Sequence, residues 1–131
     1  MLVYVCRHAQ AAPGDPDELR PLTPEGEAQA VRLGEKLAAT DPAPAVIVSS
    51  PLLSARQTAA LVARATGAEL RIDPRLAPGA GVAELRAVVA DAGALAATVG
   101  HQPDCSEIAI AVTGSDPGFP PAGVAAIELE S

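Results

Sequence analysis

The sequence predicts a three-layer α/β sandwich in which helices flank a mainly parallel β-sheet. Five short apolar, β-branched stretches alternate with segments whose apolar residues recur at helical spacing. Strands and helices that alternate in this way form a mainly parallel sheet covered on both faces. A chain of 131 residues is of ordinary size for one core, so we expect a single domain over residues 1–131.

The apolar stretches are the expected strands, and they cover residues 2–6, 46–48, 69–72, 95–99 and 124–129. Two segments rich in proline, aspartate and glycine, residues 11–21 and 114–122, are expected to be loops. Too little chain remains on either side of them for separate domains. They are therefore not interdomain linkers.

Helices are expected over about residues 23–40, 50–67 and 82–92, with a fourth after Pro103. The first is the best defined, because Thr23 supplies an N-cap, Pro24 suits the first helical position and Glu25 follows as an early acid. The second begins at Ser50-Pro51 and carries an apolar face as far as Gly67.

The composition excludes several classes of partner. Aromatic residues make up only 2% of the chain and the formal net charge is -7, so neither base stacking nor a basic surface is available for nucleic acid. The same charge disfavours an acidic membrane surface. No apolar run approaches the length of a membrane span or of a signal peptide's core, so a cytoplasmic protein is expected.

Ligands of open α/β sheets bind beyond the carboxyl ends of the strands. The two histidines of the sequence both fall at such positions, since His8 follows the first expected strand and His101 follows the fourth. A lone histidine at a strand end is usually an inert polar cap. Two in equivalent positions, with Arg7 beside one of them, favour a reactive site.

The sequence lacks the residues that other phosphate-binding, hydrolytic and metal sites require. A zinc site has no third ligand at suitable spacing, and a P-loop has no lysine because Lys36, the only one, lies inside an expected helix. A cysteine phosphatase of the C-x5-R kind would need arginine where Ala12 or Ala111 stands, and the serine hydrolase motif G-x-S-x-G is absent. We expect neither a metal nor a cofactor.

Four segments together resemble the histidine phosphatase superfamily, whose fold is also called phosphoglycerate mutase-like, and within it the SixA phosphohistidine phosphatase group. They are Arg7-His8 after the first strand, LRPLTPEGEAQA around Arg20, SSPLLSARQTA, and VGHQP at His101. The resemblance spans essentially the whole chain. It implies a metal-independent phosphatase whose partner is a phosphorylated protein or a small phosphorylated substrate.

The resemblance also implies roles for individual residues. His8 is the nucleophile and forms a phosphohistidine intermediate, Arg7 and Arg20 bind phosphate oxygens, and His101 donates to them. Neutral imidazole keeps a free lone pair near neutral pH if its other nitrogen is held by a carbonyl or carboxylate, and guanidinium groups match phosphate oxygens in pairs. Without the RPLTPEG context, Arg20 would be interpreted as a surface charge among acidic neighbours.

The sequence departs from the family pattern at two positions. Ala9 replaces a glycine, which is tolerated if φ is negative there. Ser54 stands where a phosphate-binding arginine is expected, and Arg56 follows two residues later, about 200° around a helix. Both are candidate substrate-binding residues, and which of them contacts phosphate stays open. Loss of the charged group could lower binding or turnover by on the order of ten- to several-hundred-fold.

A general acid is also missing from the segment after the third expected strand. Only Glu84 is available there, and we expect it on a solvated helix face. Because general acid catalysis matters most for poor leaving groups, the gap favours an N-phosphorylated substrate such as protein phosphohistidine. Two alternatives remain, a catalytically weakened phosphate- or phosphoprotein-binding module and a small-molecule phosphomonoesterase.

Overall fold

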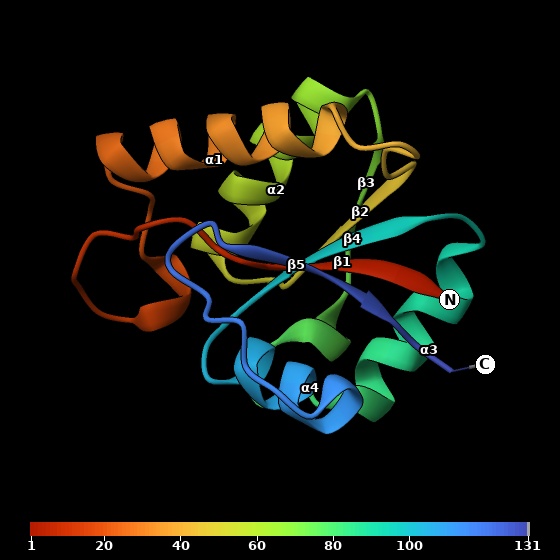
Figure 1. Cartoon of the computed structure of the whole chain (residues 1–131). Helices are drawn as coiled ribbons and strands as arrows, with labels where there is room; N and C mark the ends of the chain where they lie inside the picture. The colour runs from red at the N-terminus through yellow and green to blue at the C-terminus, as the bar shows by residue number, and fades with distance from the viewer. Residues whose placement is uncertain (131) are drawn as a thin grey trace.

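A five-stranded sheet with the order β3-β2-β4-β1-β5 runs through the centre of the molecule (Figure 1). The computed structural model describes residues 1–130, and its elements are β1 (Leu2–Arg7), η1 (Asp17–Leu19), α1 (Pro24–Ala38), β2 (Val46–Ser49), α2 (Leu53–Thr66), β3 (Glu69–Ile72), η2 (Pro74–Leu76), α3 (Val82–Ala92), β4 (Ala96–Gly100), α4 (Asp104–Thr113) and β5 (Val124–Glu128). The first four strands are parallel, and β5 is antiparallel to β1.

Helices cover both faces of the sheet, with α1 and α2 on one side and α3 and α4 on the other (Figure 1). The side chains of β1 alternate between the two layers, as the pleat of a strand requires. Val3 and Val5 join the core under α3 and α4, whereas Tyr4 and Cys6 join the core under α1 and α2. The predicted three-layer sandwich is therefore confirmed.

The start of α2 differs from the expectation that this helix begins at Ser50-Pro51. The helix begins at Leu53, with Leu52 as its N-cap. Ser50 stays attached to the sheet, because its backbone N–H donates to the carbonyl of Val99 at 3.0 Å. Its hydroxyl accepts from the N–H of Leu52 at 3.3 Å. Ser50 is thus a residue of the strand end, not of the helix.

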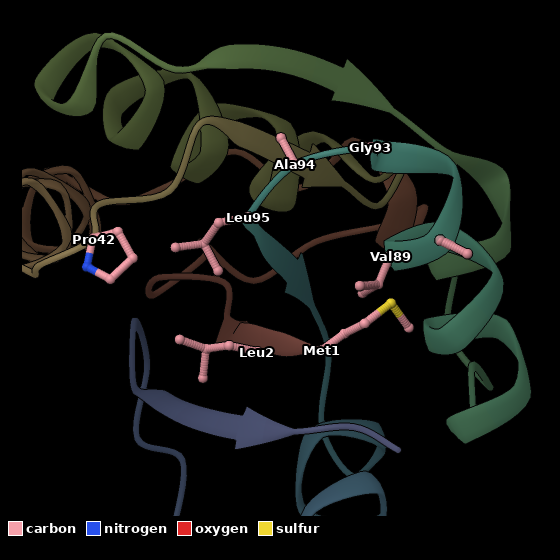
Figure 2. Close-up of a pocket in the computed structure, with 8 residues that line it drawn as sticks. Met1, Leu2, Pro42, Val89, Gly93, Ala94 and Leu95 are labelled. Carbon is pink, nitrogen blue, oxygen red and sulfur yellow. The ribbon is translucent and has the colours of Figure 1, made fainter. Parts of the chain in front are cut away.

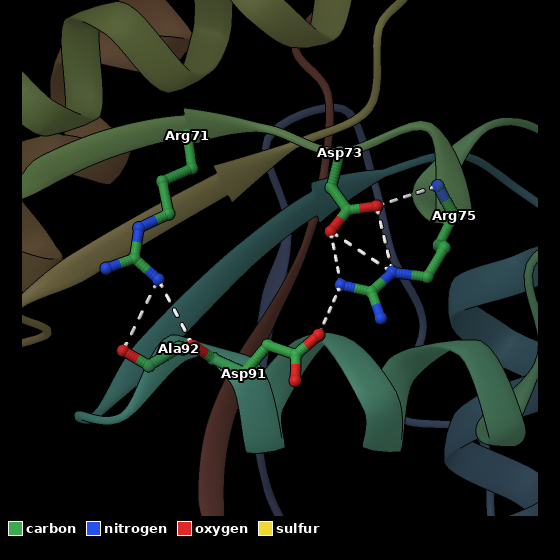
Figure 3. A network of polar contacts seen from close by, with 5 residues as sticks. All are labelled: Arg71, Asp73, Arg75, Asp91 and Ala92. Atoms are coloured by element: carbon green, nitrogen blue, oxygen red, sulfur yellow. Dashed lines mark hydrogen bonds and ion pairs between the residues drawn. The ribbon is translucent and has the colours of Figure 1, made fainter.

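Charged side chains fasten the exposed edge of the sheet to the end of α3 (Figure 3). Arg75 pairs with Asp73 at 2.7 Å and with Asp91 at 2.9 Å. Arg71 reaches the carbonyls of Asp91 and Ala92, both at 3.4 Å. The hydrogen bond from Arg75 holds the pKa of Asp73 below its usual value. This network anchors the chain just before the loop that follows η2.

The long loop between β1 and α1 is anchored at its base. Ala11 and Leu22 form an antiparallel bridge, and the hydroxyl of Thr23 donates to the side-chain oxygen of Gln10 at 2.9 Å. The carbonyl of Gln10 packs so closely on α1 that a Cβ placed at Gly26 would lie 2.1 Å from its oxygen. The glycine of TPEGE therefore permits the contact that holds this loop against the helix.

Replacing Gly26 with alanine is expected to displace the loop and lower the activity that the sequence predicts for His8 at least about tenfold, because the backbone carbonyl of Gln10 must move away from the added methyl group. Steady-state rates and thermal unfolding of the variant measure both effects. Glu25→Ala, an exposed change in the same helical turn, is the control. Wild-type activity in Gly26→Ala would contradict the importance of this contact.

No helix among residues 1–130 is both long enough and apolar enough to cross a membrane.

Candidate active site

A pocket of about 370 Å³ lies beyond the carboxyl ends of β1 and β4. Four of the residues selected from the sequence line it, namely Arg7, His8, Arg20 and His101. The rings of the two histidines have their centroids 5.2 Å apart. Parallel pairing of β1 with β4 brings them together, since Arg7 lies opposite Gly100 in the sheet register. We call this cavity the phosphoryl pocket, after the group that the sequence predicts it to bind.

His8 has one ring nitrogen engaged and the other free of any partner among the described residues. Its Nδ1 lies 2.7 Å from the carbonyl oxygen of Ala9, and because a carbonyl can only accept, Nδ1 carries the proton and Nε2 keeps its lone pair. Burial lowers the pKa of His8, with Arg7 and Arg20 acting in the same direction. His8 is thus a neutral imidazole with an available nucleophilic nitrogen.

Thr58, on α2, holds the backbone of Ala9, the residue whose carbonyl orients His8. Its buried Oγ1 accepts from the N–H of Ala9 at 3.0 Å and donates to the carbonyl of Ser54 at 2.8 Å. Sequence reasoning missed this role. The available signal was a threonine on the buried face of a helix, a position that apolar residues usually occupy.

Ala9 itself fits without strain. Among the described residues other than glycine, only Ala122 has a positive φ, of 61°. Ala9 is fully buried and packs with Leu22 and Ala30. The replacement of the family's glycine by alanine therefore places no strained backbone next to His8.

Arg7, the last residue of β1, carries a donor that is not satisfied within the protein. Its Nη1 donates to the carbonyl of Phe119 at 3.0 Å. Its Nε is buried and has no partner among the described residues. A buried donor without a partner costs about 1–3 kcal/mol, and an anion against the guanidinium is the kind of ligand that offsets such a cost.

Arg20 enters the phosphoryl pocket from the end of η1. Its Nε donates to the carbonyl of Ala12 at 2.7 Å, and its Nη1 pairs with Asp17 at 2.8 Å. The hydrogen bond from Arg20 lowers the pKa of Asp17, so this carboxylate is ionised at neutral pH. Arg20 is both a partner of an acidic neighbour and a lining residue of the pocket, and an incoming anion competes with Asp17 for it.

His101 is 6% exposed, and its Nε2 lies 2.7 Å from the hydroxyl of Ser50. Burial, and to a smaller extent the neighbouring His8, lower the pKa of His101 to about 4. His101 is therefore neutral at physiological pH. Ser50 is a second functional residue whose role the sequence did not reveal, although its position at the end of β2 placed it at the correct edge of the sheet.

The pKa of His101 makes folding sensitive to acid. The unfolded chain binds a proton as pH falls through 6.5, whereas the native ring resists it until about pH 4. We expect the free energy of unfolding to fall by up to about 3 kcal/mol between pH 7.5 and pH 4 from this group. Urea unfolding across this range measures the loss. The loss of unfolding free energy should be smaller in His101→Gln than in wild type. Equal losses in the two proteins would contradict the assignment of this acid sensitivity to His101.

The structure does not bring Ser54 and Arg56 into the phosphoryl pocket. Ser54 lies in the first turn of α2 and is 4% exposed. Arg56 donates from Nε to the carbonyl of Pro51 at 2.9 Å and borders a neighbouring groove that also contacts Asp17. Neither side chain lines the cavity at His8, so nothing in the described pocket takes the place of the family's third arginine.

Glu84 is also outside the pocket. Its Oε1 accepts from the N–H of Gly81 at 2.7 Å and caps the start of α3. Asp17 is the one carboxylate among the residues that line the phosphoryl pocket. Because the pKa of Asp17 is lowered by Arg20, it is poorly suited to donate a proton. The described pocket thus holds no evident general acid.

A second hollow, of about 400 Å³, lies at the opposite end of the sheet (Figure 2). Apolar side chains such as Met1, Leu2, Val89 and Leu95 line it together with Pro42. None of its lining side chains is acidic, basic or a hydroxyl. It offers no group for acid-base or nucleophilic chemistry.

Over residues 1–130, no group of three or more histidine, cysteine, aspartate or glutamate side chains is arranged to hold a metal ion. The two cysteines, Cys6 and Cys105, are buried and free.

Comparison with known proteins gives consistent matches. The family model of the histidine phosphatase superfamily (branch 1) matches residues 3–96. An uncharacterized protein of Picosynechococcus sp. is 36% identical over 126 residues, which cover 90% of this chain and 76% of that protein.

Two solved structures are similar to this chain in both sequence and fold. A candidate phosphohistidine phosphatase SixA from Agrobacterium tumefaciens is 29% identical, with a TM-score of 0.83 over 95% of this chain and 88% of its own. A second candidate of the same name, from Nakamurella multipartitia, is 33% identical, with a TM-score of 0.75 over 95% of this chain and 82% of its own. These matches extend over nearly all of the chain.

Proposed function

The chain belongs to the histidine phosphatase superfamily, with a SixA-like, phosphoglycerate mutase-like fold, and we propose that it removes the phosphoryl group from protein phosphohistidine through a phosphorylated His8. Membership of the superfamily supports phosphatase activity. One observation carries the finer proposal. A histidine with its Nδ1 bound to a carbonyl and its Nε2 free lies in the same pocket as Arg7, Arg20 and His101.

In the first step the lone pair on Nε2 of His8 attacks phosphorus of a substrate phosphoimidazole that is protonated on its distal ring nitrogen. A P–N bond forms to His8, the P–N bond to the substrate breaks, and its electron pair stays on the leaving nitrogen, so that the leaving group departs as neutral imidazole. Charge spreads over the equatorial oxygens during the transfer. Arg7 and Arg20 neutralise that charge. In the tautomer whose Nε2 accepts from the Ser50 hydroxyl, the neutral His101 carries a proton on Nδ1 that it can donate.

In the second step the oxygen of a water molecule attacks phosphorus on the phosphorylated His8, and both protons of the water leave with the inorganic phosphate as H₂PO₄⁻. The bond from phosphorus to Nε2 breaks, and its electron pair returns to the imidazole. The carbonyl of Ala9 keeps the Nδ1 proton in place throughout, so the same nitrogen is ready for another turnover. Thr58 and the peptide N–H of Ala9 maintain this orientation.

The carboxylate that lines the pocket supports the proposed substrate class. Asp17 is ionised and engaged with Arg20, so the pocket favours a leaving group that departs with little acid assistance. Imidazole attached to phosphorus meets this requirement better than the alkoxide of a phosphoserine. A histidine-phosphorylated protein is therefore the proposed partner.

The proposal is tested by phosphate release from a histidine-phosphorylated protein in the presence of EDTA, with phosphoserine protein as the comparison. We expect release from phosphohistidine to be at least about 100-fold faster, because hydrolysis of the phosphoserine ester depends on a general acid that accelerates it by at least that factor. Equal rates would instead indicate a broad phosphomonoesterase. p-Nitrophenyl phosphate is unsuitable as the comparison, because its leaving group also needs little acid.

A second candidate function is a phosphohistidine-binding module with weak turnover, and the position of Arg56 outside the phosphoryl pocket favours it. If the missing third arginine limits the reaction, Ser54→Arg should raise kcat/KM by about ten- to several-hundred-fold, the cost of a lost charged hydrogen-bond donor. Arg56→Ala is the companion variant. Unchanged rates in Ser54→Arg would show that two arginines suffice.

A further inference from the structure

The groove that borders Arg56 continues directly from the phosphoryl pocket. It has a volume of about 510 Å³ and runs between η1 and the start of α2. Asp17 and Pro78 line both cavities. A substrate whose phosphoryl group lies against His8 can therefore extend its neighbouring atoms into this groove.

Apolar side chains on both walls of the groove are at least partly accessible to solvent. Leu19, on η1, has 60% of its surface exposed, the largest value among the large apolar residues described. Leu52 and Pro51 face it from the other wall, and Pro78 lies at the junction with the phosphoryl pocket. A leucine exposed beside a reactive pocket is better explained by a ligand than by the protein's own core.

The charges of the two walls differ. Glu18, on η1, forms no ion pair among the described residues, whereas Asp17 beside it is already paired with Arg20. On the α2 wall, Arg56 is held by the carbonyl of Pro51, so its aliphatic stem adds apolar surface. A basic side chain of a ligand is thus attracted to Glu18 and repelled from the Arg56 wall.

We propose that this groove docks the polypeptide segment beside the phosphohistidine of the substrate, with an apolar side chain against Leu19 and a basic side chain against Glu18. The inference rests on the proposed function, because it assigns the groove to the same substrate. It also gives Arg56 a role as a wall of the peptide groove rather than as a phosphate ligand.

Binding is measured by fluorescence anisotropy with a labelled peptide that carries a non-hydrolysable phosphonate analogue of phosphohistidine, flanked on both sides by leucine and lysine. Leu19→Ala should weaken binding about fivefold, the effect of losing one partly buried leucine contact. Glu18→Gln should weaken it about threefold at low salt. Val31→Ala and Glu35→Gln, exposed residues on α1, are the matched controls and should leave binding unchanged.

Double-mutant cycles then identify the contacts. Exchanging the peptide leucines for alanine should have little further effect in Leu19→Ala, and exchanging the lysines for glutamine should have little further effect in Glu18→Gln. If the peptide substitutions weaken binding by the same factor in the variant proteins as in wild type, the proposal is wrong. Equal losses in the α1 controls, or no binding of the peptide to wild type, would overturn it as well.

The two proposals fail in different ways. Coupled binding without phosphate release from phosphohistidine would leave the docking groove in place and contradict the proposed activity. Release of phosphate from N-phosphoimidazole, which has no flanking residues, without coupling in the peptide cycles would contradict the groove and support the activity.

Discussion

Replacing His8 with alanine is expected to lower kcat by at least about 10⁴-fold, because no other described nitrogen in the pocket has both a free lone pair and a fixed orientation. The Nδ1 bond to Ala9 gives His8 this property, whereas the Nε2 of His101 is engaged by Ser50. The measurement combines steady-state rates with trapping of ³²P from a phosphohistidine substrate. Wild type should carry acid-labile label, and His8→Ala should carry none.

His101→Gln is the informative companion to this experiment. It removes the second imidazole and leaves the proposed nucleophile, so we expect slower turnover while acid-labile label still accumulates on the protein. Label retained in His8→Ala, or release of phosphate at the wild-type rate, would exclude His8 as the nucleophile. Circular dichroism of each variant checks that the fold is intact.

Replacing Arg7 with alanine is expected to lower kcat/KM about 10³-fold, the lower end of what an arginine contributes to phosphoryl transfer. Arg7 adjoins His8 in the chain, and its buried Nε has no internal partner among the described residues. Arg20→Ala should cost less, because Asp17 already neutralises part of the Arg20 charge. Rates of phosphohistidine hydrolysis and inhibition by orthovanadate measure both variants.

Arg7→Lys separates charge from geometry. Lysine keeps the positive charge and loses the planar pair of donors, so we expect it to recover only a small part of the lost rate. Arg64→Ala, which removes an exposed arginine from the far end of α2, should leave the rate unchanged. Retention of more than about a tenth of the wild-type rate in Arg7→Ala would contradict its role as the main phosphate ligand.

The positions of Arg7, His8 and His101 could be predicted because they depend on local signals and one topological rule. Each lies directly after a short β-branched stretch, and the carboxyl ends of parallel strands meet at one edge. β1 and β4 are neighbours in the sheet. The rings of His8 and His101 therefore have their centroids 5.2 Å apart, although 93 positions separate the two residues in the sequence. Periodicity therefore anticipated much of the fold and the centre of the site.

The contributions of Thr58 and Ser50 could not be predicted in the same way. Both are hydroxyl side chains, which hydrogen-bond equally well to solvent, to their own backbone or to a distant group. Only the packing of α2 on the sheet places the Thr58 hydroxyl against the Ala9 peptide. The late start of α2 likewise depends on Ser50 remaining bonded to the sheet and to His101.

Sequence alone was sufficient for the order of strands and helices and for the Arg7-His8 pair at the end of β1, since these depend on residue type and spacing, whereas the expectation of an arginine at Ser54 came from the family resemblance. Tertiary structure decided which side chains meet. The fold places Arg56 at the border of the neighbouring groove, pairs Arg20 with Asp17 and leaves one nitrogen of His8 free. The physical reason is that hydrogen bonds and ion pairs act over a few ångströms, and only the packed fold sets distances on that scale.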